Sequence, residues 1–506
     1  MINVSENLKS VIGRRQFLVM SAGAAFLASC GGSTSNTSVS TTTQILGTES
    51  STTGASNPLW IPPAMSGTTF DIDLAASTHQ LFDGAKTKTI SYNGNPMWGP
   101  TLIMKKGDKV TVNVTNNLDE VTTAHWHGIH LPAIMDGGPH QTISAGNTWP
   151  AMWEVKNNAA TYWYHPHAHE LTWKQLNQGA GGFIIVQDDD EQALDLPRTY
   201  GIDDIPLVLT SRKFTSGNEI DTTAIYGDYL LANGTMNAEF LAPKQHVRFR
   251  VLNAEIERAY TLGFSDGREF KVIATDGGLL DAPVTVTKLP IYPGERYEIV
   301  VDFSSDAEEK IVTMQSFNGG HPFLDYPGGE EAQTGAFGSL LNNKTFDLLK
   351  IKVTASTSSA VTKLPTVLAA NTLWAKSDAT KTRDIAITDT GPGTPFTFDN
   401  KGYEMDTIAH TVKLGDTEAW SVTNGQIFPH SFHIHDVQFS MVSRSTGPVA
   451  DYEKGWKDTF SIVKGEKVTF VAKFEDYTSN DHPFMYHCHM SNHEDEGLMG
   501  QFLVVE

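Results

Sequence analysis

Histidines in this chain occur in four pairs of the form His-x-His, a spacing suited to metal binding. Two pairs lie in the first third of the chain, at 125–127 and 165–167, and two near the C-terminus, at 433–435 and 487–489. Because successive side chains of a β-strand point to opposite faces, the two imidazoles of each pair face the same way. Cys488, inside the last pair, must then face a different site. The eight histidines predict one metal cluster.

A second candidate metal site surrounds Cys488. His430 lies three residues before His433, and His493 follows the cysteine by five positions. A thiolate and two imidazoles in a trigonal plane, with a weak or absent axial ligand, form the blue-copper electron-transfer site. The bonds from Cys488 to its two histidine neighbours give a short covalent path to the cluster. Electrons that enter singly at one site can therefore collect at the other, as the four-electron reduction of dioxygen to water requires.

The elements that carry these pairs recur along the chain. Alternating apolar and polar runs, such as residues 109–114, predict many β-strands. One strand ending, Val-Thr-Asn or Val-Leu-Asn, occurs three times and ends at Asn116, Asn253 and Asn424, with 137 and 171 residues between successive copies. A repeated all-β unit of this size predicts three consecutive Greek-key barrels or sandwiches.

The middle copy differs from the other two in its chemistry. Leu262 and Phe264 stand at the positions where the other two copies have a histidine pair. We therefore expect the second domain to keep the barrel and to lack metal ligands.

Composition divides the chain into five segments. We expect domains at residues 59–190, 191–360 and 361–506, with boundaries near an acidic stretch that contains proline and near a Ser/Thr-rich stretch. Before them we expect an export signal at residues 1–29 and a tether at residues 30–58. The tether is flexible by composition, because 15 of the 26 residues from 32 to 57 are Ser or Thr and cannot bury enough apolar surface to fold.

Net charge limits the partners of the protein. The chain carries a formal charge of −21, which makes nucleic acid an unsuitable partner and favours neutral or cationic substrates. The segment after residue 29 contains no apolar run of the roughly 20 residues that span a bilayer. Any membrane association is therefore expected through an N-terminal anchor only.

The histidine motifs resemble those of the multicopper oxidases, in particular three-domain bacterial laccases, copper-efflux oxidases and bilirubin oxidases. The resemblance covers about residues 60–506 and implies three cupredoxin-like domains, four copper ions and dioxygen as a substrate. It also implies the following ligands: His430, Cys488 and His493 for the type 1 copper; His125 and His433 for the type 2 copper; and His127, His165, His167, His435, His487 and His489 for the two type 3 coppers.

The same resemblance implies two acidic residues that supply protons. Asp136 matches an acid beside the type 2 copper, and Glu494 matches one that feeds protons to reduced oxygen. Water formation consumes four protons per dioxygen, so acids near a buried site are chemically required. The alternatives are that Asp136 is a turn residue and that Glu494 belongs to a solvated acidic run with Asp495 and Glu496.

The chain departs from copper-efflux and bilirubin oxidases at the axial position of the type 1 site. Those relatives have a methionine ten residues after the copper-binding cysteine, where this chain has Leu498. Leucine cannot coordinate, so we expect a three-coordinate type 1 copper with a raised reduction potential, as in fungal laccases. The alternative is a register shift that lets Met499 bind.

Substrate class follows from these differences. Copper-efflux oxidases carry methionines and an aspartate beside the type 1 copper, whereas this chain has Gln426 and Phe428 there and a single methionine, Met314, in residues 305–385. We expect a laccase-like oxidase of phenols or aromatic amines, with Gln426, Phe428 and the loop 447–456 as candidates for the substrate pocket. The alternatives are a metallo-oxidase of cuprous or ferrous ion in copper tolerance, and a non-catalytic relative that acts through protein interaction.

The N-terminus predicts export to the periplasm or cell envelope. Arg14-Arg15 resembles a twin-arginine motif, and an apolar run leads from it to Leu27-Ala28-Ser29-Cys30, which resembles a lipobox. We expect lipidation of Cys30; the alternative is cleavage nearby with Cys30 discarded.

Replacement of the anchor residue tests this prediction. Cys30→Ala should move the protein from the membrane fraction to the soluble fraction, because the acylated residue is lost. Cell fractionation measures the change, and unchanged membrane association in the variant would contradict lipidation.

Overall fold

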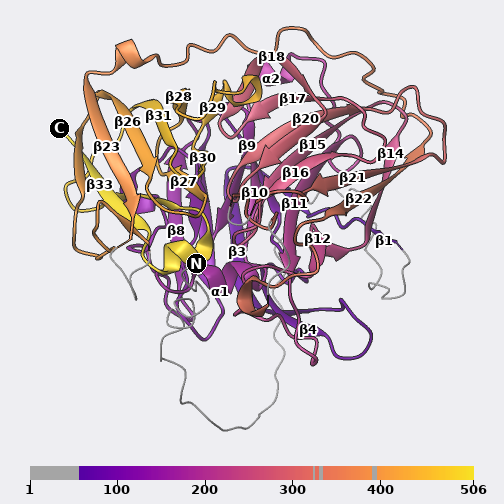
Figure 1. Cartoon of the computed structure of the whole chain (residues 1–506), viewed down its shortest axis with the longest axis horizontal. Helices are drawn as coiled ribbons and strands as arrows, with labels where there is room; N and C mark the ends of the chain where they lie inside the picture. Colours follow the sequence, from indigo (N-terminus) through magenta and orange to yellow (C-terminus); the bar gives the residue numbers. More distant parts are fainter. Residues whose placement is uncertain (1–55, 323–324, 330–333, 390–395) are drawn as a thin grey trace, which may run out of the picture.

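The protein consists of three β-domains arranged side by side. The computed structural model describes residues 56–322, 325–329, 334–389 and 396–506 (Figure 1). Six sheets form three pairs, one pair to a domain, and the pairs follow one another along the chain. The predicted all-β fold of three consecutive cupredoxin-like domains is confirmed. The described α-helices are short: α1 (Thr172–Asn177), α2 (Asp189–Gln192) and α3 (Ser491–Asp495).

Two sheets enclose the core of domain 1. Strand β6 shows why they pack: Val110, Val112 and Val114 are buried, and the side chains between them are at least partly exposed. The five-stranded sheet contains, in order, β2 (Ala64–Ser66), β5 (Thr101–Lys105), β10 (Gly182–Gln187), β9 (Ala160–His165) and β7 (His125–His127). The four-stranded sheet contains β4 (Thr87–Tyr92), β3 (Thr69–His79), β6 (Lys109–Asn116) and β8 (Thr148–Glu154).

Domain 2 has a seven-stranded and a six-stranded sheet. Leu262 and Phe264, at the histidine offsets of the repeat, are buried in its hydrophobic core. The seven-stranded sheet contains β13 (Thr235–Met236), β12 (Tyr229–Ala232), β11 (Asp204–Arg212), β15 (His246–Asn253), β20 (Arg296–Asp302), β17 (Phe270–Thr275) and β18 (Gly278–Val286). The six-stranded sheet contains β1 (Asn57–Pro58), β14 (Ala238–Pro243), β22 (Thr345–Thr354), β21 (Ile311–Phe317), β16 (Tyr260–Phe264) and β19 (Lys288–Ile291).

Domain 3 repeats the plan of domain 1. Its core includes Cys488 and Leu498 among aromatic and aliphatic side chains. The six-stranded sheet contains β24 (Thr397–Phe398), β23 (Lys381–Thr388), β26 (Thr417–Asn424), β31 (Lys467–Lys473), β28 (Phe439–Arg444) and β29 (Trp456–Lys457). The five-stranded sheet contains β25 (His410–Lys413), β33 (Met499–Val505), β32 (Phe484–Cys488), β27 (His430–Ile434) and β30 (Thr459–Ile462).

The asparagines of the repeated strand ending form the same hydrogen-bonded corner in each domain. Asn116, Asn253 and Asn424 are fully buried at the ends of β6, β15 and β26. Each side-chain amide donates to a backbone carbonyl four or five residues ahead and to the carbonyl of a distant isoleucine. Each side-chain oxygen accepts from the N–H two residues ahead. The corner satisfies buried backbone groups where the chain leaves the strand.

In domains 1 and 3, a tyrosine packs on a glycine beside the second histidine pair of the domain. Tyr164 faces Gly182 across β9 and β10, and Tyr486 faces Gly500 across β32 and β33. A Cβ on Gly182 would lie 2.3 Å from Tyr164 Cζ, and one on Gly500 would lie 2.2 Å from Tyr486 Cζ. Only glycine leaves room for the ring, which explains why the sequence repeats this pair.

Domain 2 also binds the segments on either side of it. Asn57 and Pro58 form β1, which pairs with β14, so the end of the predicted tether belongs to the folded body. After β22, Leu364 and Leu368 pack against domain 2, before β23 begins domain 3 at Lys381. The precise domain limits remain predictions, because the linkers lie on the domains they join.

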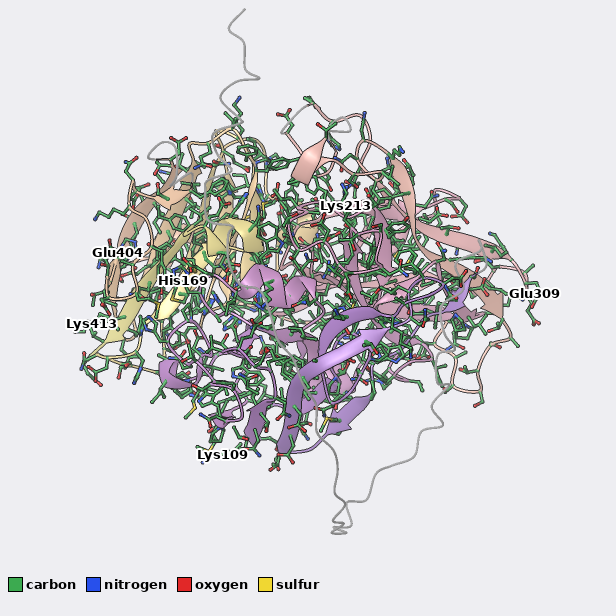
Figure 2. All side chains as sticks on the ribbon, turned by 90° about the horizontal axis from the view of Figure 1, so that it is seen from below. Lys109, His169, Lys213, Glu309, Glu404 and Lys413 are labelled. Atoms are coloured by element: carbon green, nitrogen blue, oxygen red, sulfur yellow. The ribbon has the colours of Figure 1, made fainter. Side chains whose placement is uncertain are left out.

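Charged side chains of the outer strands and loops lie at the rim of the molecule. Lys109, Glu309, Glu404 and Lys413 are exposed there, and the helices α1 and α3 lie side by side near the centre of the same view (Figure 2). Among the described residues, no helix combines the length and hydrophobicity needed to cross a bilayer. Cys30, Arg14 and Arg15 lie outside the described residues.

Candidate metal centre

Strand alternation turns the histidines away from the domain cores. Trp126 in β7, Phe432 in β27 and Tyr486 in β32 are core residues of their domains. The residues that flank them in sequence face the opposite side. His125 and His127 from domain 1 therefore meet the histidines of domain 3 at the interface between the two domains.

The eight histidines form one buried cluster that both domains share. The rings of His125 and His435 stack with centroids 3.8 Å apart, and those of His127 and His433 stack at 3.7 Å. Strand pairing brings in the others, since His125 pairs with His165 in the β7–β9 ladder and His433 pairs with His487 in the β27–β32 ladder. All eight are buried.

Hydrogen bonds fix the orientation of six of the eight rings. Five rings donate through Nδ1, whereas His127 contacts its partners through Nε2. The five Nδ1 bonds are His125 to the Asp136 carbonyl, His165 to the Pro166 carbonyl, His433 to the Asp458 carbonyl, His487 to the Cys488 carbonyl and His435 to the Asp136 carboxylate. His167 Nδ1 lies 3.0 Å from Glu494 Oε1 but lacks the geometry of a hydrogen bond. Bonds of this kind set the tautomer, and hence the nitrogen left for a metal.

The remaining nitrogens fit a cluster of metal ions. The Nε2 atoms of His125, His165, His433 and His435 are buried and have no hydrogen-bond partner among the described residues. Burial lowers the pKa of His165 to about 3 and that of His487 to about 4, so the rings are neutral. Neutral imidazoles with unpaired, converging nitrogens are the donor set of copper proteins.

Two pairs of nitrogens point at one another within the cluster. His127 Nδ1 lies 3.1 Å from His489 Nε2, and His167 Nε2 lies 3.2 Å from His487 Nε2. His435 groups with the second pair, and His125 groups with both His433 and His435. The predicted division into a type 2 site and two type 3 sites stays a prediction, because the possible groups of histidine ligands share members.

The second site is a triangle of donor atoms around Cys488. Its Sγ lies 3.5 Å from His430 Nδ1 and 3.6 Å from His493 Nδ1, and the two nitrogens lie 3.2 Å apart. A point equidistant from the three atoms lies about 2 Å from each, close to ordinary metal–nitrogen and metal–sulfur bond lengths. Burial raises the pKa of the Cys488 thiol to about 12 and lowers that of His430 to about 3. A bound cation stabilises the thiolate that burial alone disfavours.

Alternation in β32 assigns Cys488 and its neighbours to different sites, as the sequence predicted. Cys488 faces the core of domain 3 with Phe432, its strand partner in β27. His487 and His489 face the cluster. Three consecutive residues are thus divided between the two sites.

The position expected for an axial ligand is occupied by Leu498. It accepts the N–H of Cys488 through its carbonyl, and its side chain is fully buried in the same core cluster as the cysteine. Met499 instead pairs with His487 across β32 and β33. Cross-strand partners share a face of the sheet, so the Met499 side chain lies on the cluster side and away from Cys488.

Aromatic and acidic side chains surround His493. The ring of Phe396 lies 3.9 Å from the His493 ring, and Phe428 follows Phe396 at 6.4 Å. On the other side, Glu257 Oε2 lies 3.7 Å from His493 Nε2 and accepts a hydrogen bond from Asn492. Sequence reasoning missed Phe396 and Glu257, which come from loops distant from the ligand motifs.

Both predicted acids are buried against histidines. Asp136 Oδ2 accepts from His435 Nδ1 at 2.7 Å, and burial, with the charge of Asp436, raises the Asp136 pKa well above its usual range. Glu494 Oε1 lies 3.0 Å from His167 Nδ1 and Oε2 lies 3.4 Å from His487 Nδ1. Glu494 is only 1% exposed, so the alternative that it belongs to a solvated acidic run is wrong.

Asp495 continues from Glu494 toward the surface. Its carboxylate accepts the backbone N–H groups of Thr172 and Trp173 at the start of α1, and it is partly exposed. Burial, with the nearby charge of Glu494, raises the pKa of Asp495 to about 8. The pair therefore places an acid that can be protonated near neutral pH next to the carboxylate that contacts the cluster.

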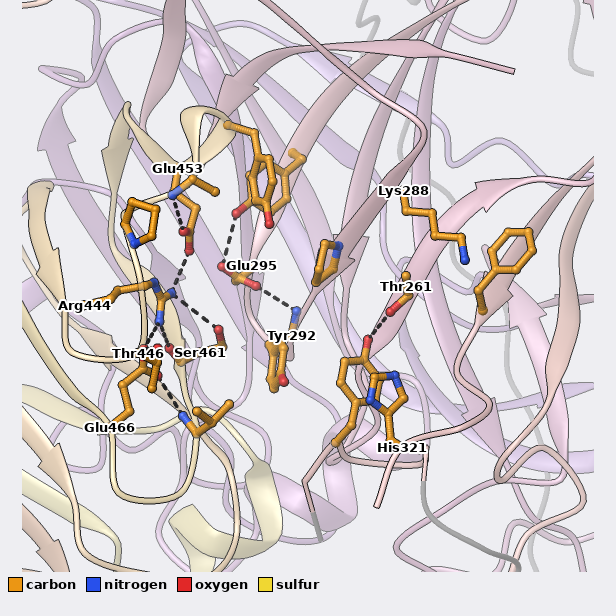
Figure 3. Close-up of a pocket in the computed structure, with 18 of the residues that line it drawn as sticks. Thr261, Lys288, Tyr292, Glu295, His321, Arg444, Thr446, Glu453, Ser461 and Glu466 are labelled. Atoms are coloured by element: carbon orange, nitrogen blue, oxygen red, sulfur yellow. Dashed lines mark hydrogen bonds and ion pairs between the residues drawn. The ribbon is translucent and has the colours of Figure 1, made fainter. Parts of the chain in front are cut away.

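A separate cavity of about 610 Å³ lies between domains 2 and 3 (Figure 3). Tyr292 and Glu295 line it from domain 2, and Arg444 lines it from domain 3 with ion pairs to Glu453 and Glu466. Part of the loop 447–456 lines this cavity. The side chains found next to His493 are those of Phe396, His430, Cys488 and Glu257, so the sequence-based placement of this loop at the substrate pocket receives no support.

The fold and the two sites define a class of copper-binding oxidoreductase built from cupredoxin-like domains. Models of the multicopper oxidase family match residues 74–191, 205–322 and 375–506. The chain belongs to the multicopper oxidases and is an enzyme of that family.

Known relatives differ in their described roles. A multicopper oxidase of Staphylococcus aureus is 31% identical over 436 residues, which cover 84% of this chain and 86% of the relative. The cell division protein FtsP of Proteus mirabilis is 31% identical over 430 residues, covering 84% and 87%. The solved structure of a laccase-like oxidase from Ochrobactrum, active on lignin model compounds, is 31% identical with a TM-score of 0.78, covering 88% of this chain and 100% of that one.

Leu498→Met tests the axial position. A thioether at this place should lower the reduction potential of the type 1 site, because a fourth, axial donor stabilises the oxidised ion more than the reduced one. Redox titration of the blue absorption measures the change. Met499→Leu is the control and should leave the potential unaltered; a raised potential in that control would show that Met499 already coordinates.

Glu494→Gln tests the acid beside the cluster. The amide keeps the size of the side chain but cannot carry a proton, so oxygen uptake should fall about 100-fold while the blue absorption remains. The exposed Glu496 offers a matched control, since Glu496→Gln should retain full turnover. Full oxygen uptake by the Glu494 variant would refute the assigned role.

Proposed function

We propose that the protein is a laccase-like oxidase, which removes single electrons from phenols or aromatic amines and reduces dioxygen to water. The observation that carries this proposal is the aromatic wall over His493. Phe396 lies against the imidazole, Phe428 continues the wall, and both rings are partly exposed. Such a wall favours planar aromatic substrates over hydrated metal ions.

The donor sets support four copper ions, one held by Cys488, His430 and His493 and three held by the eight-histidine cluster. Bound copper would supply reversible one-electron transfer and the multi-electron reduction of dioxygen. The reaction balances when four phenols each lose one electron and one proton, and one dioxygen takes up four electrons and four protons to give two waters.

The chain itself connects the two sites. Electrons that enter at His493 reach Cys488, whose backbone leads directly to His487 and His489. His487 Nδ1 also donates to the carbonyl of Cys488 at 3.0 Å. This short path suits transfer without a mobile carrier and supports the proposed division of roles.

Carboxylates at both ends handle protons in this proposal. Glu257, 3.7 Å from His493 Nε2, can receive the proton that a phenol releases on oxidation. At the cluster, Asp136 holds a proton beside the histidines, and Glu494 relays to the cluster the protons that Asp495 supplies from the surface.

Two other functions remain as competing hypotheses. A metallo-oxidase of cuprous or ferrous ion requires a metal-binding group near His493. Gln426, at the position where copper-efflux oxidases have aspartate, is buried, and its amide donates to the Thr388 carbonyl. A non-catalytic role, suggested by the likeness to a cell division protein, does not require the eleven donor residues that this chain retains.

The proposal also covers location. We propose export by the twin-arginine pathway and anchoring at Cys30, which suits a protein that folds before it crosses the membrane. This rests on the sequence alone, since these residues lie outside the described part of the chain.

Oxygen uptake with different donors tests the proposed activity. We expect turnover on a phenolic dye to exceed turnover on cuprous ion at equal concentration, because aromatic rings line the site beside His493. Cys488→Ser should lose both the blue absorption and the uptake. Faster oxidation of cuprous ion would favour the metallo-oxidase, and persistent uptake in the variant would overturn the mechanism.

A further inference from the structure

Arg296 of the ligand-free domain 2 reaches the histidine cluster through Asp458 of domain 3. The guanidinium and the carboxylate are fully buried, and two parallel hydrogen bonds of 2.6 Å join them. This is the bidentate geometry that makes arginine–carboxylate pairs both strong and directional.

Arg296 has all five of its N–H donors in use. Two bind Asp458, and the others donate to the carbonyls of Thr161, Gly294 and Asp276 at 3.0–3.1 Å. Thr161 belongs to domain 1, Gly294 and Asp276 to domain 2, and Asp458 to domain 3. A single fully satisfied side chain therefore fixes the position of the Asp458 carboxylate relative to all three domains.

Asp458 in turn contacts His127, the ring that meets its partners through Nε2 and not through Nδ1. Asp458 Oδ1 lies 3.1 Å from His127 Nε2, and Thr459 Oγ1 lies 3.2 Å from the same nitrogen. The Thr459 hydroxyl also donates to Asp458 Oδ1 at 2.9 Å. A carboxylate is an acceptor, so the His127 proton resides on Nε2 and Nδ1 is left facing His489.

We propose that Asp458, held by Arg296, is a positioning residue that fixes the tautomer of His127 and so prepares the cluster to bind its copper. The domain that has no ligands of its own thereby takes part in assembling the site. The aspartate does not touch the substrate or the reacting atoms.

Further buried charges form ion pairs next to Arg296 and Asp458, on the side away from the cluster. Lys457 Nζ lies 3.0 Å from Asp276 Oδ2 and 3.1 Å from Glu295 Oε1. Glu295 lines the cavity between domains 2 and 3, where it also accepts the N–H of Tyr292 (Figure 3). A chain of ion pairs thus extends from the cavity wall to the cluster, and each charge in it has a partner of opposite sign.

Thr459, the residue after Asp458, contacts two histidines of the cluster. Its hydroxyl lies 3.2 Å from His127 Nε2 and 3.2 Å from His433 Nδ1, which itself donates to the Asp458 carbonyl. Consecutive residues at the start of β30 therefore orient a histidine from each of the two domains.

A variant series separates positioning from general stability. Asp458→Asn weakens the hydrogen bonds from Arg296 and lets an amide N–H face His127 Nε2. This favours the His127 tautomer that carries its proton on Nδ1. We expect copper binding at the cluster to weaken about 10- to 100-fold, as for other groups that orient metal ligands. Thr459→Val, which keeps shape and charge, should weaken it less. The blue absorption of the type 1 site should persist in both.

Asp204→Asn is the matched control. Asp204 is also buried and binds Arg250 through two hydrogen bonds of 2.7 and 2.8 Å, but within domain 2 and away from the histidines of the cluster. The loss of this carboxylate should lower the thermal unfolding temperature, while the copper content stays at four ions per chain.

The measurements are copper per chain after dialysis against a chelator, the type 2 copper signal by electron paramagnetic resonance, and the blue absorption. Selective loss of cluster copper in the Asp458 variant supports the proposal. Full retention of cluster copper, or equal loss from both sites, would overturn it. If Asp458→Asn yields no folded protein, Thr459→Val decides between the same outcomes.

Discussion

The structure depends on eight uncharged imidazoles buried together where the first and last domains meet. A buried imidazole that gained a proton would lose its ligating nitrogen and repel its neighbours, so each ring must stay neutral. Burial achieves this, and hydrogen bonds from the second nitrogen of six rings select the tautomer. Neither domain completes the cluster alone. The interface between them is therefore part of the metal centre.

Strand alternation converts this interface into two sites with different functions. In β32 the thiol of Cys488 points into the core of domain 3, and its two neighbours point out of it. The core side is apolar and closed by Leu498, which suits a site that exchanges single electrons with little rearrangement. The interface side is lined by nitrogens and carboxylates, which suits a reaction that consumes protons. One strand thus separates an apolar environment from a polar one.

Much of this arrangement could be predicted from the sequence, because the ligand pairs are local patterns. A spacing of two residues fixes the facing of side chains within a strand, so the eleven donor residues and the separate position of Cys488 follow from short segments. Arg296 and Asp458 could not be found this way. They lie 162 residues apart in different domains, and nothing in their spacing marks the contact.

The acidic residues show a second limit. A run of Glu494, Asp495 and Glu496 looks solvated by composition, yet the helix α3 turns only its first member toward the cluster. Phe396 and Glu257 approach His493 from separate loops, whose paths depend on the packing of whole domains. Residues that touch a site only through tertiary packing leave no periodic signal in the chain.

The asparagine corner has a consequence for how such a chain can change over time. Asn116, Asn253 and Asn424 close their domains with the same three hydrogen bonds, and none of these bonds involves a histidine. The architecture of each unit is thus independent of its metal chemistry. A duplicated unit can exchange a histidine pair for Leu262 and Phe264 and still fold, which leaves it free to become a support for its neighbours. Gain and loss of copper then require only a few substitutions on an unchanged framework.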